Sequence, residues 1–369
     1  MRQAAHIALL VVAALLSACG HKAAVRDTEA LYTPRYAEGF SIERDKASGV
    51  KLLCVKNPWQ GAEDIRYYYP IDTLAPKGRI IAMSSSYAAM LDVIGCADRI
   101  VGLSGCHFIY TPSIRQAVER GEIAEVGYDA AFDFEMIRSL GADLVLLYGV
   151  TGEAKAITAK LDELAIPYLY IGDYLENSPL GKAEWMVAIA SICGVEERGK
   201  AVFSDIEERY NALRSTKHCS AYRPRVMLNL PYRDTWFMPP ANSYMVRLIE
   251  DAGGEYILTE SNDSNDMQSR SIAISLEEAL VYASRADFWI NLGQIASLDE
   301  LRAAAPRFAN IEAVRSKRIY NNTKRTNESR GSDFWESGTV RPDLILSDLI
   351  NIIHYEAPTD SLHYYKQLN

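Results

Sequence analysis

Histidine and cysteine are scarce in this chain of 369 residues, which contains six of each. The histidines are scattered, and apart from His6 near the N-terminus no two of them share the spacing of one helix face. A zinc site usually needs three or four clustered ligands, and the cysteines form no Cys-x-x-Cys pair of a zinc knuckle or thioredoxin motif. We therefore expect no metal site in the protein itself and no intrinsic cofactor.

Sequence motifs of catalysis are also absent. The chain contains no P-loop, no Gly-x-Ser-x-Gly nucleophile and no Rossmann glycine triplet. The triplet Ser84–Ser86 could supply a nucleophile, but serines that open a helix usually cap its free amides. We expect that this protein is not an enzyme.

Basic residues are in the minority, with 39 Lys and Arg against 48 Asp and Glu and a net charge of −9. An acidic chain binds polyanions poorly, which argues against nucleic acid as a partner. The length exceeds that of one hydrophobic core, so we expect two domains.

Long apolar runs occur only at the N-terminus. The apolar stretch Ile7–Leu16 follows the positive Arg2 and is too short to span a bilayer as a stable helix. Leu16-Ser17-Ala18-Cys19 is similar to the bacterial lipobox, so we expect residues 1–18 to be a lipoprotein signal peptide. A diacylated Cys19 would then anchor the chain on the extracytoplasmic, or periplasmic, face of a membrane. The alternative is a plain secretory signal cut after Ala18.

The remaining cysteines are odd in number and irregularly spaced. They are Cys54, Cys96, Cys106, Cys193 and Cys219. A Cys96–Cys106 bridge is one interpretation, because both residues flank one expected strand, and buried free thiols are the other.

The segment 19–77 is expected to hold a tether and a small β meander. Residues 20–35 have the composition of a tether. Three alternating stretches at 40–43, 50–55 and 65–69, punctuated by Gly49 and Asn57-Pro58, predict antiparallel strands on the outside of the first lobe.

Short apolar runs alternate with helical patterns between Arg79 and Tyr148. The runs are Ile80–Met83, Ile100–Leu103 and Leu144–Leu147. Such alternation predicts βαβ units and a parallel sheet buried on both faces. Ligands bind off the carboxyl ends of such strands, which places Ser84–Tyr87, Ser104–Tyr110 and Tyr148–Gly152 around one cleft.

The rest of the chain repeats this pattern. We expect an N-terminal α/β lobe over 78–177, a helical region over 178–217 that Gly194 breaks or bends, and a C-terminal α/β lobe over 218–369. In the second lobe we expect strands at 226–230, 288–291 and 318–320 and helices at 242–252, 275–283 and 341–354. Two ordinary surface helices are the alternative for the region around Gly194.

Three sequence stretches carry a family resemblance: Asp98–Gly102 (DRIVG), Asp133–Ile137 (DFEMI) and Ala142–Leu146 (ADLVL). Their order and spacing resemble the periplasmic binding proteins of metal-chelate ABC importers, which carry ferric siderophores, haem or cobalamin. The resemblance covers roughly residues 78–356. It implies an α/β fold of two similar lobes with mostly parallel central sheets, joined by one long bridging helix.

Aromatic and basic side chains fall where strand ends are expected. Tyr and Trp offer large, rigid contact areas with a polar tip, and Arg can hold an anionic chelate. The predicted ligand-binding residues are Tyr87, His107, Tyr110, Tyr128, Tyr148, Tyr232, Arg233, Trp236, Tyr244, Arg270, Arg325 and Trp335. The alternative is that these are ordinary surface residues, and that His107 only forms loop hydrogen bonds.

Glu135 and Glu277 occupy matching positions in the two halves. The resemblance implies that one glutamate on each lobe docks onto arginines of the membrane permease; Glu278 replaces Glu277 if the register differs by one. The alternative is an acidic residue in the first turn of a helix, favoured by the helix dipole.

The resemblance thus implies a monomeric, lipid-anchored receptor that delivers a metal chelate to an ABC permease dimer with its ATPase subunits. Basic residues beside the aromatics favour an iron siderophore or haem, and cobalamin is the alternative. An enzyme on a similar two-lobed chelatase scaffold is a more distant alternative, which clustered Cys or His would mark.

Overall fold

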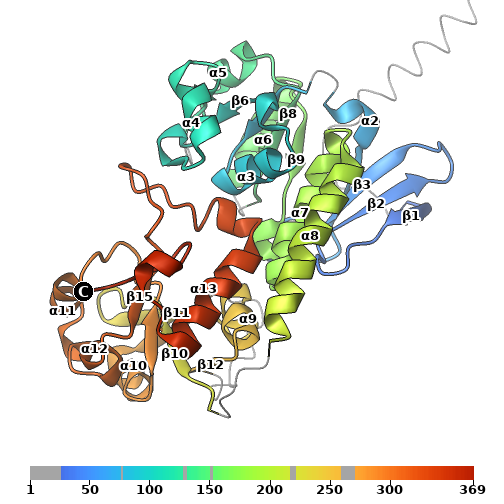
Figure 1. The fold of residues 1–369 in the computed structure, drawn as a ribbon. Helices are drawn as coiled ribbons and strands as arrows, with labels where there is room; N and C mark the ends of the chain where they lie inside the picture. The colour runs from blue at the N-terminus through green and yellow to red at the C-terminus, as the bar shows by residue number, and fades with distance from the viewer. Residues whose placement is uncertain (1–25, 76–77, 128–130, 150–152, 217–221, 259–270) are drawn as a thin grey trace, which may run out of the picture. The chain divides into compact units, whose positions relative to one another are not determined.

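The computed structural model describes residues 26–369 apart from 76–77, 128–130, 150–152, 217–221 and 259–270 (Figure 1). The chain divides into two compact units. We call the unit of residues up to 176 together with 181–203 the first lobe. The unit of residues 177–180 and 204–369 is the second lobe.

The first lobe is built on a five-stranded sheet of order β7-β6-β5-β8-β9, in which all neighbours are parallel. Its strands are β5 (Ile80–Ala82), β6 (Ile100–Leu103), β7 (Ala124–Glu125), β8 (Leu144–Leu147) and β9 (Tyr168–Tyr170). The helices that connect them are α3 (Ser85–Val93), α4 (Pro112–Glu119), α5 (Phe134–Ser139) and α6 (Glu153–Glu163). The residues of β5, β6 and β8 are all buried, which is why these strands read as uninterrupted apolar runs.

A four-stranded antiparallel sheet precedes this unit. It consists of β1 (Thr28–Tyr32), β2 (Phe40–Asp45), β3 (Lys51–Lys56) and β4 (Arg66–Pro70), paired in chain order, and the short helix α2 (Ile71–Leu74) follows. The three predicted strands are confirmed. The prediction of a tether over 20–35 is wrong for Thr28–Tyr32, because this stretch pairs with β2.

The meander packs against the rest of the first lobe, where the ring of Phe40 lies 4.9 Å from that of Trp185. Two carboxylates hold the chain between β1 and β2. Glu184 is fully buried and accepts hydrogen bonds from the backbone N–H groups of Arg35 (2.9 Å), Tyr36 (2.8 Å) and Ala37 (2.9 Å). Glu176 accepts hydrogen bonds from the Trp185 indole (2.9 Å) and from the backbone N–H groups of Glu38 and Gly39. Buried carboxylates are stable when hydrogen-bonded in this way.

The region predicted as one long bridging helix consists of two helices, α7 (Pro179–Ile192) and α8 (Glu196–Arg214). The break falls at Gly194, as predicted, where φ is +69°. The N–H of Gly194 bonds to the carbonyl of Ser191, and that of Val195 bonds back to Ala190 (2.8 Å). This left-handed cap ends α7 because only glycine adopts it without a Cβ penalty. Helix α8 begins in the first lobe and ends in the second.

The second lobe repeats the sheet with order β12-β10-β14-β15-β16, parallel except for the last pair. Its strands are β10 (Arg225–Leu228), β12 (Glu255–Tyr256), β14 (Phe288–Ile290), β15 (Ile319–Asn321) and β16 (Lys366–Gln367). A second, antiparallel pair joins β11 (Thr235–Met238) to β13 (Ile272–Ser275) and was not predicted. The helices are α9 (Tyr244–Asp251), α10 (Leu276–Ala283), α11 (Leu298–Ala304), α12 (Glu312–Arg315) and α13 (Pro342–Tyr355). Mostly parallel sheets in two α/β lobes confirm the predicted fold class.

Candidate ligand-binding surfaces

In each lobe the carboxyl ends of the parallel strands bring loops together at one edge of the sheet. In the first lobe, Ser84 follows β5 and caps α3: its Oγ accepts the backbone N–H of Ser86 (3.3 Å). The interpretation of the serine triplet as a helix cap is therefore confirmed.

The loop after β6 presents aromatic side chains and is held by one carboxylate. Glu125 accepts the backbone N–H groups of Gly105 (2.9 Å), Cys106 (2.7 Å) and Gly127 (3.1 Å). His107 and Phe108 are both exposed, with their ring centres 4.0 Å apart. The loop therefore offers a fixed pair of rings at the sheet edge. Sequence reasoning missed Glu125, although an acidic residue at the end of a short buried strand is a usable signal.

The other predicted residues of the first lobe differ from one another. Tyr110 and Tyr148 are half-buried at the carboxyl ends of β6 and β8. The prediction that Tyr87 binds the ligand is wrong, because this side chain is only 1% exposed. Its hydroxyl donates to the Ile171 carbonyl (3.3 Å), and burial raises its pKa well above the usual value. It lies in the first turn of α3 and belongs to the core. Tyr128 lies outside the described residues.

In the second lobe, the strand β10 leads into a turn whose base is fixed by two indoles. The Trp236 indole donates to the Leu228 carbonyl (3.0 Å), and the Trp289 indole donates to the Asn229 carbonyl (2.6 Å). The prediction that Trp236 binds the ligand is therefore wrong. Its side chain is 1% exposed and packs on Trp289 and Phe308, with ring centres 5.3 and 4.9 Å away. It supports the turn and is not available to a ligand.

The tip of this turn presents the predicted pair Tyr232 and Arg233. The backbone N–H of Tyr232 donates to the Thr235 carbonyl (2.8 Å), which closes a tight turn. Tyr232 is 62% exposed, and the Arg233 guanidinium lies 5.2 Å from the centre of its ring. An exposed ring and an exposed cation are thus placed together by one short turn.

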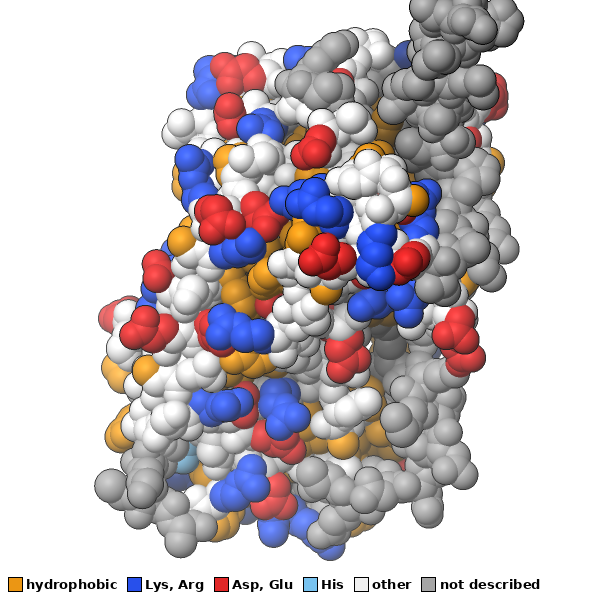
Figure 2. Space-filling view, turned by 90° about the vertical axis from the view of Figure 1, so that its right-hand side faces the viewer, with side chains coloured by type: hydrophobic (Ala, Val, Ile, Leu, Met, Phe, Trp, Pro, Cys, Tyr) orange, Lys and Arg blue, Asp and Glu red, His pale blue; other side chains and the backbone are white. Residues whose placement is uncertain are grey.

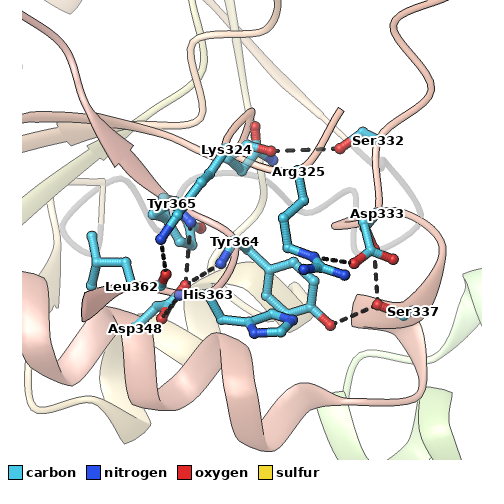
Figure 3. Close-up of polar contacts among 11 residues, drawn as sticks. Lys324, Arg325, Ser332, Asp333, Ser337, Asp348, Leu362, His363, Tyr364 and Tyr365 are labelled. Carbon is cyan, nitrogen blue, oxygen red and sulfur yellow. Dashed lines mark hydrogen bonds and ion pairs between the residues drawn. The ribbon is translucent and has the colours of Figure 1, made fainter. Parts of the chain in front are cut away.

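A second polar cluster follows β15, and Figure 3 shows its contacts. The Arg325 Nε donates to the nearly inaccessible carboxylate of Asp333 at 2.5 Å, so its charge is compensated within the lobe. Trp335 is 52% exposed and packs edge-on against Phe334 (4.8 Å). Of the predicted residues here, Trp335 is the accessible ring and Arg325 is half-buried.

The end of the chain folds onto the same edge, which the sequence did not predict. The carboxylate of Asp348 in α13 accepts the backbone N–H groups of His363 (2.7 Å), Tyr364 (2.6 Å) and Tyr365 (3.2 Å) (Figure 3). Burial, and then the charge of Arg325, lowers the pKa of His363 and so favours its neutral imidazole. The antiparallel pairing of β16 with β15 is what carries these side chains to the edge.

Two more predicted ligand residues lie in this lobe. Tyr244 is half-buried at the start of α9, directly after the cap Ser243, whose hydroxyl accepts the N–H of Val246 (3.4 Å). Arg270 lies outside the described residues.

Both candidate docking glutamates are exposed in the first turn of a helix. Glu135 follows the cap Asp133 of α5, whose carboxylate accepts the N–H of Met136 (2.8 Å). Glu277 follows the cap Ser275 of α10 and pairs with Arg307 at 2.8 Å. Its own backbone N–H and then Arg307 lower the pKa of Glu277. The first-turn interpretation is confirmed, and docking stays a prediction.

The Cys96–Cys106 bridge is absent, and the alternative of buried free thiols holds for Cys54, Cys96, Cys106 and Cys193. Cys19, the predicted lipid site, lies outside the described residues.

The described part of the chain contains no group of three or more His, Cys, Asp and Glu side chains that could hold a metal ion. None of the helices in the described ranges has the length and apolarity needed to cross a membrane. Figure 2 shows acidic and basic side chains interspersed on the face it presents, and exposed ion pairs such as Lys160–Glu163 (2.8 Å) fit that distribution.

Two α/β lobes, each built on a mostly parallel sheet with loops gathered at the strand ends, define the class of two-lobed binding proteins. The model of the periplasmic binding protein family matches residues 80–326, and the chain belongs to this family. The family consists of substrate-binding proteins of transporters: they are not enzymes, they carry transported ligands and no intrinsic cofactors, and they deliver to ABC permeases outside the cytoplasm.

Known relatives and structures agree with this assignment. An uncharacterized lipoprotein of Methanocaldococcus jannaschii is 27% identical over 293 residues, which cover 76% of this chain and 66%, just under two thirds, of the relative. A periplasmic heme binding protein from Pseudomonas aeruginosa superposes with a TM-score of 0.59 at 16% identity, covering 79% of this chain and 98% of that one. A periplasmic vitamin B12 binding protein of Vibrio cholerae gives 0.52 at 16% identity, covering 75% and 96%. At these identities the two structures speak for the fold alone.

Proposed function

We propose that this protein is a lipid-anchored receptor that captures a metal chelate and delivers it to an ABC importer. The observation that carries the proposal is the pairing of family membership with exposed rings at the carboxyl edge of each sheet. These rings are the His107–Phe108 pair in the first lobe and Tyr232 and Trp335 in the second. Rigid aromatic faces suit a large, flat ligand, because they supply contact area at little cost in conformational entropy.

An iron chelate, either a ferric siderophore or haem, is the favoured ligand. Arg233 stacks on an exposed ring and can bind a carboxylate or a catecholate oxygen of such a chelate. His107 offers an exposed imidazole, a side chain that can bind haem iron. Arg325 supports the site less directly, because Asp333 already neutralises it. Cobalamin, with fewer anionic groups, is the second candidate.

Titration of the purified, unlipidated protein with haemin, a ferric siderophore and cobalamin tests this proposal. Absorption spectra and calorimetry should show binding of one iron chelate, with quenching of Trp335 fluorescence. Replacing Tyr232 or Arg233 with Ala should weaken binding by about tenfold to a hundredfold, the range for a charged hydrogen bond or a buried ring. The matched controls are Tyr355→Ala and Arg315→Ala, which remove exposed side chains at the ends of α13 and α12. Failure of all three ligand classes to bind the wild type would contradict the receptor proposal.

Delivery is proposed to depend on Glu135 and Glu277, each of which would meet one subunit of a permease dimer. Both carboxylates are exposed and neither belongs to the ring clusters described above. Charged pairs at a rim govern docking and orientation more than affinity. Glu277 would exchange Arg307 for a permease arginine, at small cost because exposed ion pairs are weak.

A further inference from the structure

Two cysteines that lie far apart in the sequence meet inside the first lobe. Cys96 lies three residues after the end of α3, and Cys193 comes directly after α7. Both side chains are buried, 2% and 4% exposed, and a hydrogen bond links their thiols. The two sulfur atoms are therefore already neighbours in the folded protein.

Rigid backbone at both helix ends holds the two thiols in place. The N–H of Cys96 donates to the Leu91 carbonyl (2.8 Å), and that of Cys193 donates to the Ile189 carbonyl (3.0 Å). The Arg198 Nη1 of α8 donates to the Ile94 carbonyl at 3.2 Å, which fastens the α7–α8 junction to the end of α3. The contact between the sulfurs thus follows from helix packing.

We propose that Cys96 and Cys193 form a disulfide bond when the chain folds in an oxidising medium, tying the end of α3 to the end of α7. A family that works outside the cytoplasm meets such a medium, and disulfides persist there. The inference goes beyond the proposed function and needs no ligand.

The bond forms by thiol–disulfide exchange. In the folded lobe the hydrogen bond from Cys193 lowers the pKa of Cys96, burial opposes this shift, and the charge of Arg99 adds to it. Before α7 packs, Cys96 reacts as an ordinary thiol, of which a small share is thiolate at neutral pH. The thiolate is the attacking species in exchange. Cys96 attacks one sulfur of an oxidant disulfide and releases one oxidant thiolate. Cys193 then loses its proton, attacks the Cys96 sulfur and releases the second. The two electrons and two protons leave on the oxidant, which is a dithiol oxidase or oxidised glutathione.

Burial sets the time at which this bond forms. Neither sulfur is accessible in the folded lobe, so the exchange takes place while α7 is still unpacked. The disulfide becomes buried when α7 packs into the lobe. Cys106 is not a competing partner in the structure: its thiol points to the Leu103 carbonyl (3.8 Å), and burial raises its pKa to about 12. A thiol with that pKa is a poor nucleophile.

Refolding with a redox buffer tests the proposal. The Cys19→Ser protein is unfolded in guanidinium with reductant and refolded with reduced and oxidised glutathione. It is then unfolded again in the presence of N-ethylmaleimide, which alkylates free thiols, and its mass is measured by mass spectrometry. We expect two of the five remaining cysteines to escape alkylation, and a peptide joining Cys96 to Cys193. Five alkylated cysteines, or a bridge between any other pair, would overturn the proposal.

Serine variants check the assignment and its effect on stability. Cys96→Ser and Cys193→Ser should each lose the protected pair, whereas Cys106→Ser should keep it. Because the bond closes a loop of about a hundred residues, reduction should lower the melting midpoint of the parent protein by roughly 5–10 °C and leave that of Cys193→Ser unchanged. An equal shift in both proteins would contradict the assignment. Ligand binding plays no part in these readouts, so they are independent of the receptor proposal.

Discussion

Removing the carboxylate of Glu184 should detach the N-terminal meander from the first lobe. This side chain has no solvent exposure and accepts four hydrogen bonds, from the Tyr32 hydroxyl at 2.6 Å and from the backbone N–H groups of Arg35, Tyr36 and Ala37 at 2.8–2.9 Å. In Glu184→Ala these donors lose their acceptor. A buried donor left unpaired costs about 1–3 kcal/mol.

The expected loss can be worked out from the burial of each donor. Ala37 is buried and carries the full penalty, whereas water can reach the groups of Arg35 and Tyr36 after a small movement of the chain. We therefore expect Glu184→Ala to lower the free energy of unfolding by about 3–5 kcal/mol. Glu184→Gln keeps one acceptor oxygen but turns an NH₂ group toward the other donors, so it should lose about 2 kcal/mol.

Urea unfolding followed by circular dichroism measures these losses, and limited proteolysis should show new cleavage between β1 and β2. The matched control is Glu163→Ala, which removes an exposed glutamate of the same lobe that pairs with Lys160, and should change stability by less than about 0.5 kcal/mol. A loss below about 1 kcal/mol in Glu184→Ala would refute the reasoning that this carboxylate holds the meander.

Three further predictions concern anchoring, delivery and acid stability. Cys19→Ala should abolish incorporation of radiolabelled lipid, and unchanged labelling would exclude Cys19 as the anchor. Glu135→Ala combined with Glu277→Ala should leave chelate affinity nearly unchanged in calorimetry but severely cut uptake into vesicles with the permease, while each single variant loses less. Full transport in the double variant would refute docking. Burial opposes the charge of Glu196, but ion pairs with Lys200 (2.6 Å) and Lys51 (2.5 Å) dominate and lower its pKa to about 2. Its contribution to stability is therefore complete above pH 4.5 and is lost as the pH falls toward 2. In Glu196→Gln the urea concentration at the unfolding midpoint should depend less on pH over that window.

Much of the two sheets was predictable because a strand buried on both faces must be apolar throughout. The runs at Ile80, Ile100, Leu144 and Phe288 all become central strands, since no polar residue is tolerated there. The break at Gly194 was predictable for a similarly local reason, the left-handed backbone that only glycine adopts without cost.

The candidate site was predictable only in part. The sequence located the loops at the strand ends, and His107, Tyr232 and Trp335 lie there as exposed rings. It did not distinguish them from Tyr87 and Trp236, which turn inward. Whether an aromatic residue faces solvent or core depends on the helix register after a cap, or on pairing such as that of β11 with β13, and neither is visible in composition.

The sequence by itself determined the local features of this protein: the order of strands and helices, the helix caps and the family to which it belongs. Periodicity and capping act over a few residues, so they are written in neighbouring positions. Only the tertiary structure decided which side chains meet across the chain: Glu184 with the segment before β2, Asp348 with the C-terminal tyrosines, and Cys96 with Cys193. Such contacts join residues up to about 150 positions apart, and a partner at that distance leaves no mark on the local pattern of either residue.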